Sequence, residues 1–216
     1  MRVYSSLRCT EEAIASMTTL RRPRALVRGL AQGISVIFNP LVLCSLFFAT
    51  LAVRHRPWLA PLAVLWTTLV AAPTLLLGFG VHRGWWSDLD VSQLHERRTY
   101  TPWVLAAAGL ASALAWGYAF PPPLKWSIDS IFLWLAISVA VGAAWKISLH
   151  AGSSTGILAL TYLILGWRWG LALTWVPVAV GWARVRLSCH TPFQVLAGAV
   201  AGGAAVTVVW LVHPGI

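Results

Sequence analysis

The chain has 216 residues, of which 58% are hydrophobic and only 10% are charged, and it carries a formal net charge of +10. A soluble domain of this length needs more polar surface, so the composition excludes an ordinary water-soluble protein and indicates that lipid solvates much of the chain. The basic residues lie in loops between apolar segments, which favours anionic lipids or phosphorylated molecules, and not nucleic acid, as partners.

Residues 1–33 form a basic N-terminal segment of mixed polarity. They lack the short apolar core and the small-residue cleavage site of a signal peptide. One interpretation is an amphipathic helix that lies at the membrane interface. Residues 34–216 are expected to form a single transmembrane domain, because their apolar segments follow one another with short loops.

Seven apolar stretches follow this segment, and none shows the two-residue alternation of strands. A helix needs about 20 apolar residues to cross the hydrocarbon core, and the fifth and sixth stretches, which meet at Arg168, are short. They form either two thin spans or one broken re-entrant pair, and we favour two spans. The sequence therefore predicts an all-α, polytopic membrane helical bundle with six to seven transmembrane helices. The stretches are Ile34–Val53, Trp58–Val81, Pro102–Phe120, Trp126–Trp145, Ala151–Trp167, Trp169–Ala183 and Thr191–Val212.

Two further patterns concern the arrangement of these spans. Gly198 and Gly202 form a small-xxx-small face, which predicts a close contact with another helix. Seven crossings also place 12 of the 16 lysines and arginines on the side of the N-terminus, which the positive-inside rule assigns to the cytoplasm. The four on the other side are Arg54, Arg56, Lys125 and Arg168.

Three polar clusters are expected on the side of the N-terminus, namely Ser87–Arg98, Lys146–His150 and Arg184–Gln194. Arginine matches phosphate oxygens with a planar fork, lysine supplies a compact charge, and a helix N-terminus adds backbone N–H groups. His150 and His190 stand where helices are expected to begin. One imidazole can attack phosphorus while the other protonates the leaving alkoxide. The clusters therefore predict phosphate chemistry at one end of the bundle.

The spacing within the last two clusters carries a family resemblance. Arg184 is followed after five residues by His190 and then by Thr191–Gly198, while Ser148 stands two residues before His150. This pattern resembles the third and second motifs of the type 2 phosphatidic acid phosphatase (PAP2) family of membrane lipid phosphatases. The resemblance extends over roughly residues 34–212, which implies a PAP2-like fold for the transmembrane domain.

The resemblance also implies a role for each of these residues. His190 would be the nucleophile that forms a phosphohistidine, and His150 the general acid for the leaving group. Arg184 would bind phosphate oxygens with Ser148 beside it. The family requires no metal, so neither a metal nor another cofactor is expected. The other basic residues assigned to the phosphate are Lys146 and, as the nearest counterparts of an incomplete first motif, Arg97 and Arg98.

The chain departs from the family pattern at several positions. Ala183, Ile147 and Leu149 replace the Ser, Pro and Gly of the two motifs. Gln194 stands where the family has the aspartate that orients the nucleophilic histidine. Its carbonyl can accept the imidazole N–H, and we assign it that catalytic role, but an amide cannot stabilise imidazolium by charge.

The expected function is therefore a metal-independent phosphatase acting on a lipid phosphate monoester or diphosphate in a prokaryotic plasma membrane. Polyprenyl phosphate or diphosphate, phosphatidate and phosphatidylglycerophosphate are all candidate substrates, and the sequence leaves the oligomeric state open. A lipid-binding or lipid-translocating protein with a decayed site remains an alternative. So does a Mg²⁺-dependent lipid phosphotransferase, whose oxygen and nitrogen ligands would come from the first cluster. Those ligands would be Asp88, Asp90, His95 and Glu96.

Overall fold

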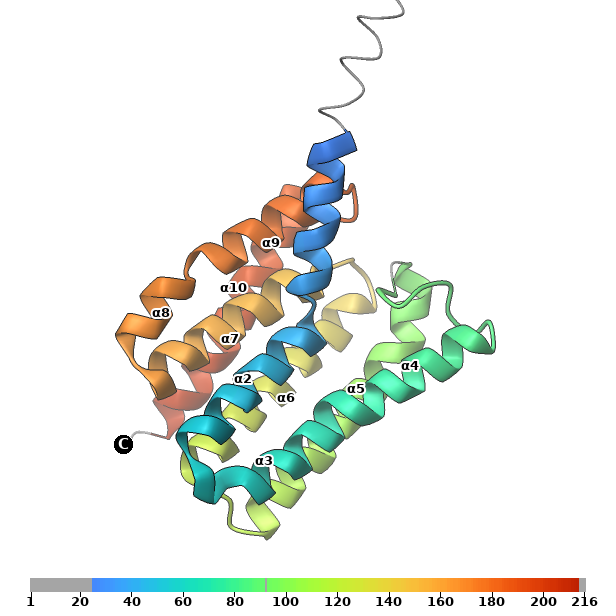
Figure 1. Cartoon of the computed structure of the whole chain (residues 1–216). Coiled ribbons are helices and arrows are strands. Elements are labelled where there is room, and N and C mark those ends of the chain that lie inside the picture. Colours follow the sequence, from blue (N-terminus) through green and yellow to red (C-terminus); the bar gives the residue numbers. More distant parts are fainter. Residues whose placement is uncertain (1–24, 92, 214–216) are drawn as a thin grey trace, which may run out of the picture.

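The computed structural model describes residues 25–91 and 93–213, so most of the basic N-terminal segment, residues 1–24, lies outside the described residues. Every regular element in these two ranges is a helix, which confirms the all-α prediction. The helices form a bundle of rods joined mostly by short loops (Figure 1). They are the unlabelled helix Ala25–Ile37 and then α2 (Pro40–Arg54), α3 (Leu59–Trp66), α4 (Ala72–His82), α5 (Leu94–Gly117), α6 (Pro122–Gly142), α7 (Leu149–Leu165), α8 (Trp167–Leu173), α9 (Trp175–Arg186) and α10 (Pro192–Val212).

Three helical segments are long and apolar enough to cross a membrane, namely Arg56–His82, which contains α3 and α4, and then α6 and α10. A fourth span results if helix Ala25–Ile37 and α2, which are bent by 50°, count as one. These spans indicate an integral membrane protein. The expected count of six to seven is not confirmed, because α5 is not among these spans, α7 has only 17 residues, and the sixth stretch is broken into α8 and α9 at Thr174.

The first apolar stretch, predicted as Ile34–Val53, contains a break at Asn39 and Pro40. The Asn39 side chain accepts a hydrogen bond from the N–H of Leu41 at 2.9 Å, and Pro40 occupies the first position of α2. A side-chain cap and an N-terminal proline both favour a new helix start at this point. Helix Ala25–Ile37 therefore runs across the expected segment boundary at residue 33 and ends before the stretch does.

The closest contact in the bundle joins α7 to α10. A methyl group added at Gly198 would lie 2.5 Å from the carbonyl oxygen of Ser148, and one at Gly202 would overlap the carbonyl oxygen of Gly152. The backbones of the two helices can approach this far only because neither glycine carries a side chain. The predicted small-xxx-small contact is thus confirmed, and its partner is α7.

Further along α7, the bundle contains a larger apolar core. Buried side chains from α2, α3, α5 and α6 meet there with Leu160 of α7 and Val206 of α10. Many large apolar side chains remain exposed on the outer faces of the bundle, for example Leu75, Val178 and Leu211. Such a surface suits contact with lipid and not with water.

Candidate functional site

The three polar clusters meet at one end of the bundle. Arg97 donates from Nη1 to the carbonyl oxygen of Ile147 at 3.0 Å, which joins the first cluster to the second. The N–H of Ser148 donates to the carbonyl oxygen of Gln194 at 3.3 Å, which joins the second to the third. Segments that lie far apart in the chain therefore build one polar site.

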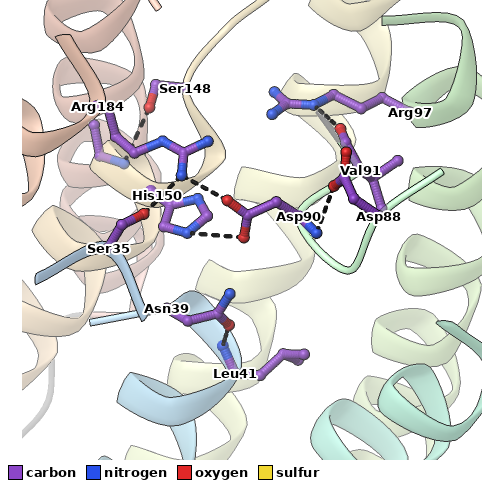
Figure 2. A network of polar contacts seen from close by, with 11 residues as sticks. Ser35, Asn39, Leu41, Asp88, Asp90, Val91, Arg97, Ser148, His150 and Arg184 are labelled. Carbon is purple, nitrogen blue, oxygen red and sulfur yellow. Dashed lines mark hydrogen bonds and ion pairs between the residues drawn. The ribbon is translucent and has the colours of Figure 1, made fainter. Parts of the chain in front are cut away.

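Arg184 lies at the centre of this site and is fully buried near the end of α9. Its Nη1 donates to Ser35 Oγ and to Asp90 Oδ2, both at 2.7 Å (Figure 2). Its Nε and Nη2 have no hydrogen-bond partner among the described residues. One edge of the guanidinium is thus fixed, while the Nε–Nη2 edge, which suits a bidentate oxyanion, is buried and unpaired.

His150 lies in the first turn of α7, one position after Leu149, and is 4% exposed. Ser148 caps this helix by accepting a hydrogen bond from the N–H of Ala151 at 3.4 Å. The imidazole Nε2 faces Asp90 Oδ1 at 3.7 Å, an ion-pair distance slightly longer than a hydrogen bond. Catalytic contacts are often this loose before substrate binds.

His190 reaches the site through a turn at the end of α9. Ser188 takes a left-handed conformation with φ of 57°, and the N–H of His190 then returns to the carbonyl oxygen of Arg184 at 3.3 Å. This turn brings the backbones of Arg184 and His190 together across a spacing of five residues. The ring is 5% exposed, and neither of its nitrogens has a hydrogen-bond partner within the described ranges.

Gln194 is the predicted partner of His190, but its amide caps the helix that carries it. The side-chain oxygen accepts from the N–H of Thr191 at 3.1 Å, and the Thr191 hydroxyl accepts from the N–H of Gln194 at 3.2 Å. Reciprocal bonds of this kind form a capping box at the start of α10. The same side chain also acts on His190 by raising its pKa, against the larger effects of burial and the cations. The orienting role assigned to Gln194 stays a prediction.

The electrostatic field in the site is dominated by cations. Burial, together with the charges of Arg97, Lys146 and Arg184, lowers the pKa of His190 to about 3, so its ring is neutral and can act as a nucleophile at neutral pH. Burial and the charge of Arg97 also lower the pKa of Lys146. Burial acts to raise the pKa of Asp90, but His150 and Arg184 outweigh it and hold that pKa below its ordinary value.

The two arginines of the first cluster play different parts. Arg97 is buried and donates from Nε to the carbonyl oxygen of Val91 at 2.8 Å. Arg98 is exposed and donates to the carbonyl oxygens of Gly142 and Ala143 at the end of α6. Both arginines, with Lys146, line a cavity of about 280 Å³ between α5 and α6. Arg98 and Lys146 thus border the site, whereas Arg97 reaches its centre.

The side chains that would hold Mg²⁺ point to separate partners. Glu96 accepts from the N–H of Ser87 at 2.8 Å and from its hydroxyl at 3.0 Å, which closes the loop before α5. Asp90 faces Arg184. Within residues 25–91 and 93–213, no group of three or more His, Cys, Asp or Glu side chains is placed to hold a metal ion.

Sequence reasoning assigned no site role to Ser35, and named Asp90 only as a ligand of the alternative Mg²⁺ site. Ser35 lies inside an apolar stretch, so nothing in its surroundings marks it. Asp90 belongs to the polar cluster Ser87–Arg98, but the PAP2 motifs contain no carboxylate that corresponds to it. Asp90 lies between Arg184 and His150, and such a contact between distant segments cannot be predicted from residue spacing.

Comparisons with protein families, with curated proteins and with solved structures gave no match. The chemistry of the site follows from its own groups. These are an unpaired guanidinium edge, two buried imidazoles, further cations around them and the carboxylates of Asp88 and Asp90. Together they can bind an oxyanion, attack it and transfer a proton.

Proposed function

We propose that this protein is a metal-independent membrane phosphatase of PAP2-like fold that hydrolyses a phosphate monoester or diphosphate of a lipid through a phosphohistidine. The observation that carries the proposal is the Nε–Nη2 edge of buried Arg184, unpaired among the described residues, at the same end of the bundle as two buried histidines. A buried guanidinium edge without a partner is costly unless an anion fills it. Phosphate oxygens match that edge in shape and charge.

The reaction follows from the roles of the two imidazoles. A ring nitrogen of His190 attacks phosphorus with its lone pair, and the P–O bond to the lipid breaks. The electron pair stays on the leaving oxygen, which takes a proton from His150. Water then attacks the phosphohistidine and gives a proton to His150 as the N–P bond breaks. Inorganic phosphate is released, and both histidines return to their starting states.

Two adjacent cavities offer the lipid tail a place between the helices. One, of about 100 Å³, is lined by Asp90, Arg97 and His150. A second cavity of about 100 Å³ continues toward the middle of the bundle and reaches Leu160 and Val206. The residues that line both are Pro40, Leu41, Val104, Leu135 and Ser153. In this arrangement the headgroup occupies the polar site while one hydrocarbon chain follows the cavities.

The charge distribution supports a cytoplasmic site in a prokaryotic plasma membrane. Among the described residues, seven lysines and arginines lie in the segments at the site end and four in those at the opposite end. Cysteines introduced at Lys146 and Lys125, in a chain without its native cysteines, report on the two ends. The proposal expects a membrane-impermeant thiol reagent added outside cells to label residue 125 and not residue 146. The reverse pattern would place the site on the outer face.

The direct test is phosphate release by the purified protein in detergent with EDTA present. The substrates are a polyprenyl phosphate and its diphosphate, phosphatidate and phosphatidylglycerophosphate, and the variants are His190→Ala, His95→Ala and Arg184→Lys. We expect His190→Ala to abolish release and His95→Ala, which removes an exposed histidine from the same end, to retain it. Arg184→Lys keeps the charge but loses the fork, so kcat/KM should fall about 100-fold. Alkaline quench of the wild type should trap phosphate on His190.

A specific observation favours a second candidate, a protein that binds lipid phosphates without hydrolysing them. The amide of Gln194 caps α10, so His190 lacks the charged partner that supports attack in the family. Binding of the lipid phosphates by folded wild-type protein, with no phosphate released from any of them, would establish this candidate and overturn the phosphatase. Activity that EDTA abolishes would instead favour the Mg²⁺-dependent transferase.

A further inference from the structure

Asp90 touches both side chains to which the proposed reaction assigns the phosphate and the proton. It lies in the loop between α4 and α5, and its side chain points into the space between Arg184 and His150 (Figure 2). Oδ2 accepts from Arg184 Nη1 at 2.7 Å, and Oδ1 lies 3.7 Å from His150 Nε2. A single carboxylate therefore connects a group of α9 with a group of α7.

The loop holds Asp90 in this position at a conformational cost. The next residue, Val91, has φ of 46°, a left-handed conformation that β-branched residues rarely adopt. Its side chain is buried, and its carbonyl oxygen accepts from Arg97 Nε at 2.8 Å. The N–H of Asp90 donates to Asp88 Oδ1 at 2.8 Å. Strain of this kind persists only where surrounding contacts enforce it, and it is concentrated at functional sites.

The two histidines differ in the charges around them. Burial and the cations Arg184 from α9 and Arg97 from α5 disfavour the protonated form of His150, and Asp90 from the loop opposes them. The charged groups that act on His190 are Arg97, Lys146 and Arg184, all of them cations, while the neutral side chain of Gln194 opposes them. In the described part of the chain, the carboxylate of Asp90 thus faces the predicted proton donor and not the predicted nucleophile.

We propose that Asp90 is a positioning residue that holds His150 as the proton donor and fixes Arg184 beside it. The inference rests on the proposed function. A carboxylate at one imidazole nitrogen sets the orientation of the ring and stabilises imidazolium, the form that must protonate the leaving oxygen. The other ring nitrogen then delivers the proton. Asp90 in the loop thereby orients His150, the proposed proton donor. In the PAP2 family the aspartate orients the nucleophilic histidine, and Gln194 stands at that position here.

The same carboxylate also sets the position of the phosphate. Asp90 and Ser35 both engage Nη1 of Arg184, so the guanidinium cannot rotate without breaking two hydrogen bonds. Its Nε–Nη2 edge stays directed at the oxyanion, at a fixed place relative to His150. Precise placement of a proton donor is worth a large factor in rate, because small displacements slow proton transfer strongly.

The test compares two substrates that differ in their need for an acid. An alkyl phosphate leaves as a basic alkoxide and requires protonation, whereas 4-nitrophenyl phosphate leaves as a weakly basic phenolate. Asp90→Asn keeps an oxygen that can accept from Arg184 but loses the charge that faces His150. We expect kcat/KM for a short-chain alkyl phosphate to fall about 100-fold, and kcat/KM for 4-nitrophenyl phosphate, which does not include the later hydrolysis of the phosphohistidine, to change less than about threefold. His150→Ala should show the same selective loss.

Two further variants control for folding and charge. Asp129→Asn changes a half-buried carboxylate of α6 that accepts from Ser112 and Trp116, away from the site, and should leave both rates unchanged. Asp90→Glu keeps the charge and should recover part of the alkyl phosphate rate lost in Asp90→Asn. Gel filtration and thermal unfolding verify that each variant is folded.

Each other outcome would overturn a defined statement. If Asp90→Asn loses the same fraction of its activity toward both substrates, the role of Asp90 is overturned and the phosphatase is not. The same holds if neither Asp90→Asn nor Asp90→Glu loses activity toward either substrate. Failure of folded wild-type protein to hydrolyse either substrate or any of the lipid phosphates would overturn the proposed function, and this inference with it.

Discussion

The two faces of α7 differ in how closely they are packed. On the α10 side, Gly198 and Gly202 lie against the backbone of Ser148 and Gly152, with no space for a side chain. Toward α2, α5 and α6, the same helix borders two cavities, to both of which it contributes Ser153, and one of them extends to Gly202 at the edge of the tight face. The difference shows that one helix can both fix its neighbour and border a cavity. The tight face fixes the start of α7 against the start of α10, while the loose face leaves space for a substrate.

The largest effect is expected where the tight face leaves least space. Gly202→Val adds a branched side chain where even a methyl group would overlap the carbonyl oxygen of Gly152. Because that atom belongs to a helix backbone, the two helices must separate, at a cost above the roughly 1–3 kcal/mol of ordinary overpacking. We expect no monodisperse protein on gel filtration in detergent. Gly78→Val, at an exposed glycine of α4 with open space around it, is the control and should fold.

A smaller change at the same contact reaches the site directly. Gly198→Ala places a methyl group 2.5 Å from the carbonyl oxygen of Ser148, which must shift together with His150. The folded protein should lose about 1–3 kcal/mol of stability. The rate of phosphate release should fall about 10- to 100-fold, because misplacement of a catalytic group by a fraction of an ångström is costly. Wild-type turnover in Gly198→Ala would show that the tight face does not position the site.

The loose face offers a variant that changes binding and not folding. Val104 lines both cavities, and Val104→Trp fills the space between them. KM for a long-chain lipid phosphate should rise about tenfold, equivalent to about 1.4 kcal/mol, while KM for 4-nitrophenyl phosphate stays unchanged. Leu110→Trp, at an exposed position of the same helix, is the matched control. Equal KM values for the long-chain substrate in wild type and Val104→Trp would exclude these cavities as the path of the tail.

A further expected effect concerns pH and the buried imidazole of His190, which precedes α10. The pKa of His190 is about 3 in the folded protein, well below its ordinary value of 6.5. Between these values the unfolded chain takes up a proton that the folded chain does not, so stability falls as the pH falls from about 6.5 toward 3. The slope from this group is at most about 1.4 kcal/mol per pH unit. Thermal unfolding of His190→Gln should show a weaker acid dependence than the wild type, and parallel curves would contradict it.

The sequence predicted the helices better than it predicted the partners of their side chains. Apolar length and glycine spacing are local properties, and they correctly indicated an all-α chain and the contact made by Gly198 and Gly202. The break at Asn39 and Pro40 was missed because the stretch remains apolar across it. The count of spans was not confirmed, since a run of apolar residues does not reveal where a helix bends or ends.

Within the site, spacing identified the groups but not their pairings. Arg184 and the two histidines do lie at one end of the bundle, as expected from motifs that begin helices. The amide of Gln194 bonds to its own helix start, because the nearby backbone N–H of Thr191 is available to it. Asp90 and Ser35 reach Arg184 from distant segments, and only the assembled bundle defines such contacts.

The bond between Ser35 and Arg184 joins residues 149 positions apart in the chain. During synthesis the first helix enters the membrane long before α9 is made, and domains of this kind form distant contacts only after the later segments have arrived. A nascent chain that has inserted its early helices therefore contains Ser35 and Asp90 but not yet Arg184, to which both bind. In the proposed phosphatase, the anion site would therefore form only near the end of translation, after α9 has been made.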